Sequence, residues 1–250
     1  MIEKLQVLKE NFSKVLLLLL SLALLGGIIV MAAGSDDSAI EESPPSKPWE
    51  PNAKQRTYAL LTGIPQHGPV LGSRKAPVTL QFFGDLQCKE SRQVVLGALP
   101  FLIRHWVRSG KLQIRFRSTE TDTRGAGGWS EFREQQSAAM AAGKQDKLWN
   151  FIDVFYREQG PEFTGYVDEA FLNRIAADAG LDLRQWSQDW VPLREAAIDL
   201  IQADEDLAAD FALGVTPSFL IGRTGGPARP LHHFSVGEPK VFDEAIEELL

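Results

Sequence analysis

The sequence of 250 residues predicts an α/β fold in which a mixed sheet is interrupted by a block of helices. Two observations predict this fold. Residues 76–117 have the pattern of a strand, a helix and a second strand, which is the order of a parallel β-α-β unit. A long helical stretch at about 130–213 is followed by two short apolar strands and a last helix, and these elements are suited to complete the same sheet.

The β-α-β unit has the clearest pattern. Ala76–Phe83 is an apolar run with the length of a buried strand. The helix after it runs from about Cys88 to Ser109, with apolar residues at helical spacing, and Pro100 is expected to kink it. Gly110 ends this helix, and residues 111–117 then alternate between polar and apolar side chains, as a half-buried strand does.

The helical stretch contains several helices with their own start and stop signals. Asp168 is expected to cap the N-terminus of a helix that Gly180 closes. A later helix stops at Gly214. The remaining predicted elements are a strand at 218–221, a second strand near 231–235 and a terminal helix at about 240–250.

Composition excludes several classes of function. A net charge of −7 argues against a general nucleic-acid-binding protein, which would carry a basic surface. One cysteine and four scattered histidines do not form a zinc-binding cluster. No glycine-rich loop follows a strand in a nucleotide-binding pattern. We therefore expect no metal, no cofactor and no nucleic-acid partner.

The N-terminus carries an export signal. Residues 15–33 form an uncharged apolar run of about 19 residues, enough to cross a membrane as one helix. Lysines in residues 1–14 favour a cytoplasmic N-terminus and an extracytoplasmic remainder in a single-pass cell-membrane protein. A cleaved signal peptide, which would give a secreted protein, is the alternative. Residues 34–54, rich in Ser, Asp, Glu and Pro, are expected to be a flexible linker before a folded domain at 55–250.

Cys88 is the only cysteine, and it stands where the first strand turns into a helix. Free N–H groups at a helix start favour a thiolate, and solvent is expected to reach this corner. Ser91 can donate a hydrogen bond to the thiolate. Lys89 favours the thiolate and Glu90 opposes it, so only a modest shift of the thiol pKa is expected. Asp85, just before the loop, is expected to be a helix cap or a proton relay.

Four segments resemble the DsbA-like branch of the thioredoxin-fold thiol:disulfide oxidoreductases. They are Ala76–Thr79 leading to Phe83–Cys88, the stretch Ala141–Tyr156, the stretch Phe171–Asp182, and Gly214–Ile221. The resemblance covers residues 55–250. It implies a thioredoxin-like sheet with a helical insertion at about 130–213, and it makes Cys88 the active-site cysteine.

The resemblance also implies that the loop Val215-Thr216-Pro217 faces Cys88 and binds substrate. In this family the bond before Pro217 is cis, and the loop presents the backbone of Val215 and Thr216 to a partner polypeptide, which pairs with it like an added strand. An ordinary trans proline that opens an edge strand is the alternative.

The chain departs from the family at its working motif. The family carries Cys-x-x-Cys, whereas this chain has the single-cysteine sequence Cys88-Lys89-Glu90-Ser91, so it cannot store an internal disulfide. Three activities stay open. In the first, Cys88 forms mixed disulfides with exported polypeptides, and a substrate thiol, a small thiol or a membrane redox partner resolves them, as in an isomerase or reductase. In the second, the domain is an inactive protein that binds a partner or peptide at the membrane. In the third, Cys88 reacts with peroxide and forms a sulfenic acid.

Overall fold

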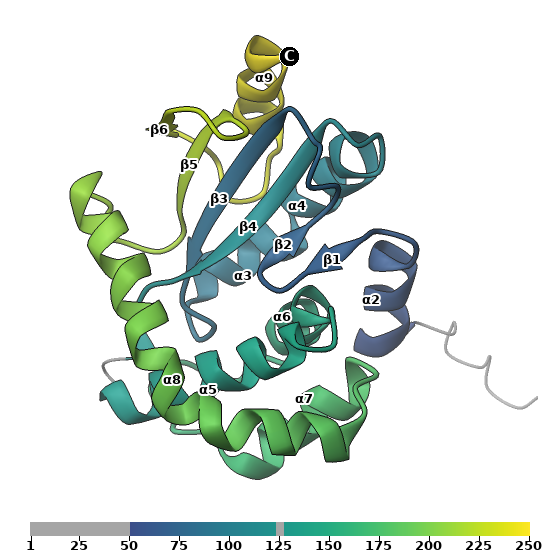
Figure 1. The fold of residues 1–250 in the computed structure, drawn as a ribbon, viewed down its shortest axis with the longest axis vertical. Coiled ribbons are helices and arrows are strands. Elements are labelled where there is room, and N and C mark those ends of the chain that lie inside the picture. The colour runs from purple at the N-terminus through teal and green to yellow at the C-terminus, as the bar shows by residue number, and fades with distance from the viewer. Residues whose placement is uncertain (1–50, 124–127) are drawn as a thin grey trace, which may run out of the picture. The chain divides into compact units, whose positions relative to one another are not determined.

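Two parallel strands, β3 (Val78–Gly84) and β4 (Leu112–Ser118), form the centre of the sheet, with Leu80 opposite Ile114. The computed structural model describes residues 51–123 and 128–250. Within them the strand order is β1-β2-β4-β3-β5-β6 (Figure 1). The other strands are β1 (Gln66–His67), β2 (Val70–Leu71), β5 (Ser218–Arg223) and β6 (Ala228–Pro230). The parallel pair confirms the predicted β-α-β unit, and β5 pairs antiparallel with β3.

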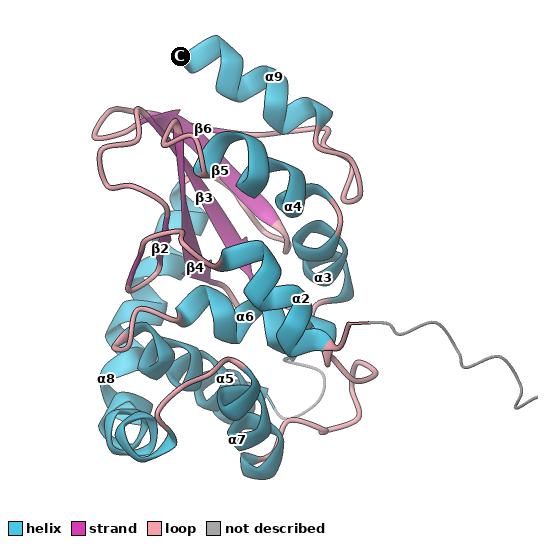
Figure 2. Ribbon diagram, turned by 90° about the vertical axis from the view of Figure 1, so that its right-hand side faces the viewer, coloured by secondary structure: helices cyan, strands magenta, loops and turns pink. Residues whose placement is uncertain are grey.

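The two faces of the sheet differ in character. Leu112, Ile114 and Phe116 on β4 belong to the main hydrophobic core, whereas the alternating residues Arg115 and Arg117 are only partly buried on the other face. Helices from both ends of the folded part cover the core face, and Figure 2 shows α3 and α4 along it. They are α3 (Lys89–Leu96), α4 (Ala98–Leu102) and α9 (Lys240–Leu249).

The helix after β3 is broken, but not at the predicted kink. The break lies at Gly97, between α3 and α4, and a π-helical turn, η1 (Ile103–Val107), follows α4. Pro100 has no N–H to donate to the carbonyl of Leu96, and its ring would clash with that carbonyl. The chain therefore breaks one turn ahead of the proline, at a glycine.

The predicted helical insertion is present and follows β4. It consists of α5 (Gly128–Gly143), α6 (Leu148–Arg157), α7 (Glu169–Asp178) and α8 (Leu183–Asp210). Asp168 caps α7 as predicted, since its carboxylate accepts a 2.7 Å hydrogen bond from the backbone N–H of Phe171. Gly180 follows that helix with a φ of 77°, in the left-handed region that closes helices.

The second strand after the insertion was predicted too late in the chain. β6 covers Ala228–Pro230 rather than 231–235, because the tight turn around Gly225 already pairs Gly222 with Ala228. Turn geometry fixes the register of a hairpin. Leu231 continues the contact by donating its backbone N–H to the carbonyl of Phe219.

The start of the folded part also differs from the prediction. Helix α2 (Ala53–Leu61) begins within the stretch predicted as linker, and Asn52 and Gln55 form a capping box at its N-terminus. The predicted membrane segment at 15–33 lies outside the described residues. Among the described helices, none combines the length and the apolar character needed to cross a membrane.

Candidate active site around Cys88

Cys88 is the N-cap residue of α3, at the corner that the sequence predicted. Strand β3 ends at Gly84, and three loop residues lead to Cys88, whose backbone is extended. Its sulfur accepts a hydrogen bond of 3.5 Å from the backbone N–H of Ser91. The thiol therefore contacts one of the free N–H groups at the helix start.

The loop before β5 lies against this sulfur. The Thr216–Pro217 bond is cis, as the family resemblance implied. The Cys88 thiol donates to the backbone carbonyl of Thr216 at 3.3 Å, across 128 positions of sequence. The side chain of Val215, next to it, is 67% exposed. The structure thus brings Cys88 together with the predicted loop and leaves the front of that loop open to a partner.

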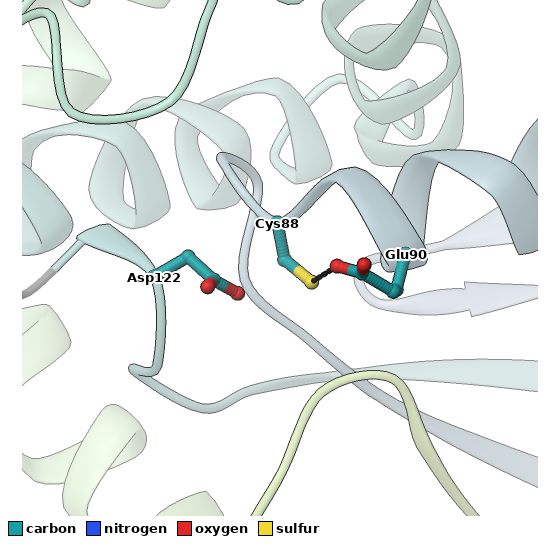
Figure 3. A group of neighbouring side chains, drawn as sticks. All are labelled: Cys88, Glu90 and Asp122. Carbon is teal, nitrogen blue, oxygen red and sulfur yellow. Dashed lines mark hydrogen bonds between the residues drawn. The ribbon is translucent and has the colours of Figure 1, made fainter.

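The thiol is buried, which corrects the expectation that solvent reaches it. Cys88 is 1% exposed. Figure 3 shows its sulfur between two carboxylates, that of Glu90 from α3 and that of Asp122 from the loop after β4. The thiol donates to Glu90 over 3.6 Å. Both carboxylates are negatively charged acceptors that favour the protonated sulfur.

This environment raises the pKa of the Cys88 thiol from its ordinary value of 9.0 to about 12. Burial is the largest cause and the Asp122 carboxyl is the second, while Thr216 and Ser91 lower the pKa by less. The predicted modest shift was wrong, because it weighed only the neighbours in sequence. At neutral pH the sulfur is a thiol in this conformation.

The predicted tuning residues have other partners. Lys89 lies 3.7 Å from the carboxylates of both Glu90 and Glu162, which raise the pKa of its ammonium group, so its charge is compensated. Ser91 contacts the sulfur through its backbone N–H. Its hydroxyl is buried and forms no well-aligned hydrogen bond with the described residues. The hydroxyl is nevertheless close enough to the sulfur to lower the pKa of the thiol.

Asp85 is a structural anchor and does not cap α3, which corrects one of its two predicted roles, while the role of a proton relay stays a prediction. Its buried carboxylate accepts hydrogen bonds from the backbone N–H groups of Gln87, Thr121 and Thr123, all within 3.0 Å. These bonds tie the loop after β4 to the loop after β3. They therefore hold Asp122 beside the sulfur, while Cys88, and not Asp85, caps α3.

The helical insertion supports the cysteine loop from the other side. The amide of Gln159 donates to the carbonyls of Leu86 and Cys88, at 2.8 and 3.2 Å. The hydroxyl of Tyr156, on α6, donates to the carbonyl of Asp85 at 2.9 Å. The backbone of the loop is thus held by groups about 70 positions away in sequence.

A model of the family described as Thioredoxin matches residues 65–225. The chain belongs to the thioredoxin family. The match includes both the Cys88 corner and the cis-proline loop. A curated relative, the probable disulfide bond formation protein D of Bacillus anthracis, is 26% identical over 168 residues, which cover 64% of this chain and 71% of the relative.

Solved structures share this fold, and several of them are DsbA proteins by name. BdbD from Bacillus subtilis in its oxidised form matches with a TM-score of 0.59 and 19% identity, over 76% of this chain and 97% of that chain. The α-DsbA1 protein of Wolbachia pipientis matches with a TM-score of 0.58 and 21% identity, over 77% of this chain and 94% of the α-DsbA1 chain. These likenesses confirm the thioredoxin-like DsbA-type fold with its helical insertion.

In this thioredoxin-family site, three donor atoms are close enough to share a metal ion. The sulfur of Cys88 and carboxylate oxygens of Glu90 and Asp122 lie within 4.8 Å of one another. Each is a chemically suitable ligand for a divalent cation. The expectation of no metal stays a prediction.

Asp122 is the site residue that the sequence analysis missed. A signal for it was present. Because β3 and β4 are parallel, the residues that follow them lie at the same edge of the sheet. Thr121-Asp122-Thr123 follows β4 as Asp85 to Cys88 follow β3. A polar residue in this position was therefore a candidate neighbour of the thiol.

Proposed function

We propose that this thioredoxin-family protein acts on thiols or disulfides of exported polypeptides by forming mixed disulfides at Cys88. The observation that carries the proposal is the 3.3 Å contact between the Cys88 sulfur and the Thr216 carbonyl, beside the exposed Val215. A nucleophile stands there next to a backbone segment with which an extended polypeptide can pair. The names of the curated relatives, disulfide bond formation proteins, support the same class of chemistry.

The single cysteine defines a two-step cycle. The Cys88 thiolate attacks one sulfur of a substrate disulfide, so a Cys88–substrate disulfide forms and the other substrate sulfur leaves as a thiolate that takes up a proton. A second thiol then attacks the mixed disulfide and releases Cys88. If this thiol belongs to the substrate, the net reaction is isomerisation. If a small thiol instead attacks the Cys88 sulfur, the substrate leaves with both of its sulfurs reduced. A second small thiol then releases Cys88, and the two small thiols end as a disulfide with each other.

The raised thiol pKa makes the resting site slow. A rise from 9.0 to about 12 lowers the thiolate population at pH 7 about a thousandfold. The more basic thiolate is a better nucleophile, with a Brønsted coefficient of roughly 0.4–0.5, which recovers part of the loss. The resting thiol is therefore expected to react about fiftyfold more slowly than an unperturbed thiol. Reaction at a useful rate requires a partner that moves the acceptors away from the sulfur.

The burial and protonation of the Cys88 thiol favour a second candidate function. A buried thiol, held protonated by Glu90 and Asp122, suits a domain that binds a partner at the Val215–Pro217 loop without covalent turnover. The two candidates share the binding surface and differ in whether the sulfur reacts.

We further propose that the domain works outside the cytoplasm, held to the membrane by residues 15–33. The length of this apolar run and the lysines before it support the proposal. Protease treatment of intact cells that express the full chain tests it. Digestion of the domain in intact cells is expected, whereas protection until the cells are lysed would contradict it.

Trapping in cells separates the two candidate functions. The full chain and its Cys88→Ala variant are expressed, thiols are blocked with acid and an alkylating agent, and adducts are separated without reductant. Adducts that disappear with reductant and with Cys88→Ala are expected. If both proteins capture the same partner without any reducible adduct, the mixed-disulfide function is refuted and the binding function stands.

A further inference from the structure

A second pocket, separate from the Cys88 site, opens between the end of β4 and the helices α5 and α8. Its volume is about 440 Å³, within the range of small-molecule sites. In Figure 1, α5 and α8 lie beside the lower end of β4. None of the residues that line this pocket contributes to the thiol site described above.

One wall of the pocket is apolar. It includes Met140 from α5 and Leu193 and Leu200 from α8. Leu200 is 55% exposed although it is a large aliphatic side chain. Because apolar surface in a concave site is stabilised when a ligand removes it from water, this wall favours an apolar ligand group.

The other wall carries an excess of positive charge. This wall is lined by three basic side chains, Arg115, Arg117 and Lys144, and by one carboxylate, that of Asp204. Arg117 is paired with Asp204 at 2.6 Å. Arg115 is partly buried, and its guanidinium makes no hydrogen bond or ion pair with the described residues. Burial and the charge of Arg117 lower the pKa of Arg115, and the nearby carboxylate of Asp204 offsets only part of this effect.

A buried amide donor in the same wall is also without a partner. Gln136 is fully buried, and its side-chain oxygen accepts a 3.1 Å hydrogen bond from the hydroxyl of Ser118. Its side-chain nitrogen, in contrast, has no acceptor within the described part of the chain. Buried donors in proteins are normally paired, so this one points to an acceptor that the protein itself does not supply.

We propose that this pocket binds an organic anion with an apolar body, such as a carboxylate or phosphate carried on a single acyl chain. The head group accepts from Arg115 and from the amide of Gln136. The acyl chain of the ligand covers Met140, Leu193 and Leu200. The anion supplies a direct hydrogen-bonding partner for the guanidinium of Arg115, because the oxygens of the nearby Asp204 carboxylate are already held by Arg117 and by the backbone N–H of Ser118 at 2.9 Å. This ligand site goes beyond the thiol chemistry proposed above and does not depend on it.

Calorimetric titration of the full chain tests the site. The probes are dodecanoate, dodecyl phosphate, dodecyltrimethylammonium and acetate, all below their micellar concentrations. Dodecanoate or dodecyl phosphate is expected to bind, and the tighter of the two identifies the head group. The cationic amphiphile and acetate are expected to bind at least about tenfold more weakly, as loss of a charged hydrogen bond predicts. Absence of binding by both anionic amphiphiles, or equal binding of the cationic one, overturns the proposal.

Variants assign the binding to this pocket. Arg115→Gln is expected to weaken binding of the anionic amphiphile at least about tenfold. The matched control, Arg104→Gln, changes an exposed arginine on η1 outside the pocket and should leave the affinity unchanged. If Arg115→Gln does not fold, Leu200→Ser on the exposed rim replaces it, with a several-fold loss expected. Unchanged affinity in a folded Arg115→Gln or Leu200→Ser variant overturns the proposal.

Discussion

Two opposing sets of contacts fix the protonation state of Cys88. The helix start, through the backbone N–H of Ser91, stabilises the thiolate. Burial and the carboxyls of Asp122 and Glu90 stabilise the thiol, and they prevail over Ser91 and the Thr216 side chain, since the pKa rises to about 12. A helix terminus therefore activates a cysteine only where acidic and buried surroundings do not outweigh it.

Replacement of Asp122 should make the thiol more reactive. Asp122→Asn removes the second-largest cause of the raised pKa of Cys88, so the pKa falls and the thiolate population at pH 7 rises. We expect several-fold faster alkylation by iodoacetamide at pH 7, measured by mass spectrometry. Asp199→Asn, an exposed change on α8, is the control and should not alter the rate. An equal rate in Asp122→Asn and the unmodified chain would contradict this account.

The raised pKa also predicts a loss of stability at alkaline pH. The folded state holds the Cys88 proton more tightly than the unfolded state, so the contribution to stability is intact below pH 9.0 and is lost as the pH rises toward about 12. At pH 10.5 the loss is roughly 2 kcal/mol. Urea unfolding of the full chain and of Cys88→Ser at pH 8 and 10.5 measures it. The unmodified chain should lose that much more than the variant, and parallel losses in both would refute the assignment.

At the scale of single elements, the first turn of α3 is built to accept a second sulfur. The hydroxyl of Ser91 is buried and lacks a hydrogen-bond partner among the described residues, while its N–H lies 3.5 Å from the Cys88 sulfur. A sulfur at this position would replace a hydroxyl whose effect on the site is to lower the pKa of the Cys88 thiol.

Ser91→Cys is accordingly expected to form an internal disulfide with Cys88. Mass spectrometry of the oxidised full chain should show the loss of two hydrogens, and the variant should oxidise a reduced test peptide, which the unmodified chain cannot do by this cycle. Ser109→Cys, in the turn after η1, adds a cysteine away from the site and serves as control. A Ser91→Cys protein that keeps two free thiols after oxidation would show that the turn cannot close the bond.

The elements were predictable from sequence where local patterns decide them. Hydrophobic periodicity was sufficient for β3, β4 and the helical insertion, because each buries one continuous face. The break at Gly97 was missed because a proline acts on the carbonyl four positions earlier. The burial of Cys88 was not predictable, since Gln159 and Tyr156 enclose its loop from distant positions.

At the scale of the whole molecule, one buried carboxylate on α8 forms hydrogen bonds with the central strand β4, beside the apolar contacts of Ala208 with Phe83 and Leu220. Asp204 on α8 accepts from Arg117 at 2.6 Å and from the backbone N–H of Ser118 at 2.9 Å, both on β4. Burial raises the pKa of this carboxyl, and Arg117 and Ser118 offset part of the rise. The pair stands beside the proposed anion pocket, so it links the helical insertion, the central strand and that pocket.

Removal of this carboxylate should loosen the insertion on the sheet. Asp204→Ala leaves the partly buried guanidinium of Arg117 without its counter-ion and Ser118 without an acceptor, so the free energy of unfolding should fall by about 3 kcal/mol. Hydrogen exchange should accelerate first in α8 and at the end of β4, whereas β5 and α9 keep their protection. Asp206→Ala, on the exposed side of the same helix, controls for helix propensity. A uniform acceleration across the domain would show instead that the insertion and the sheet open as one unit.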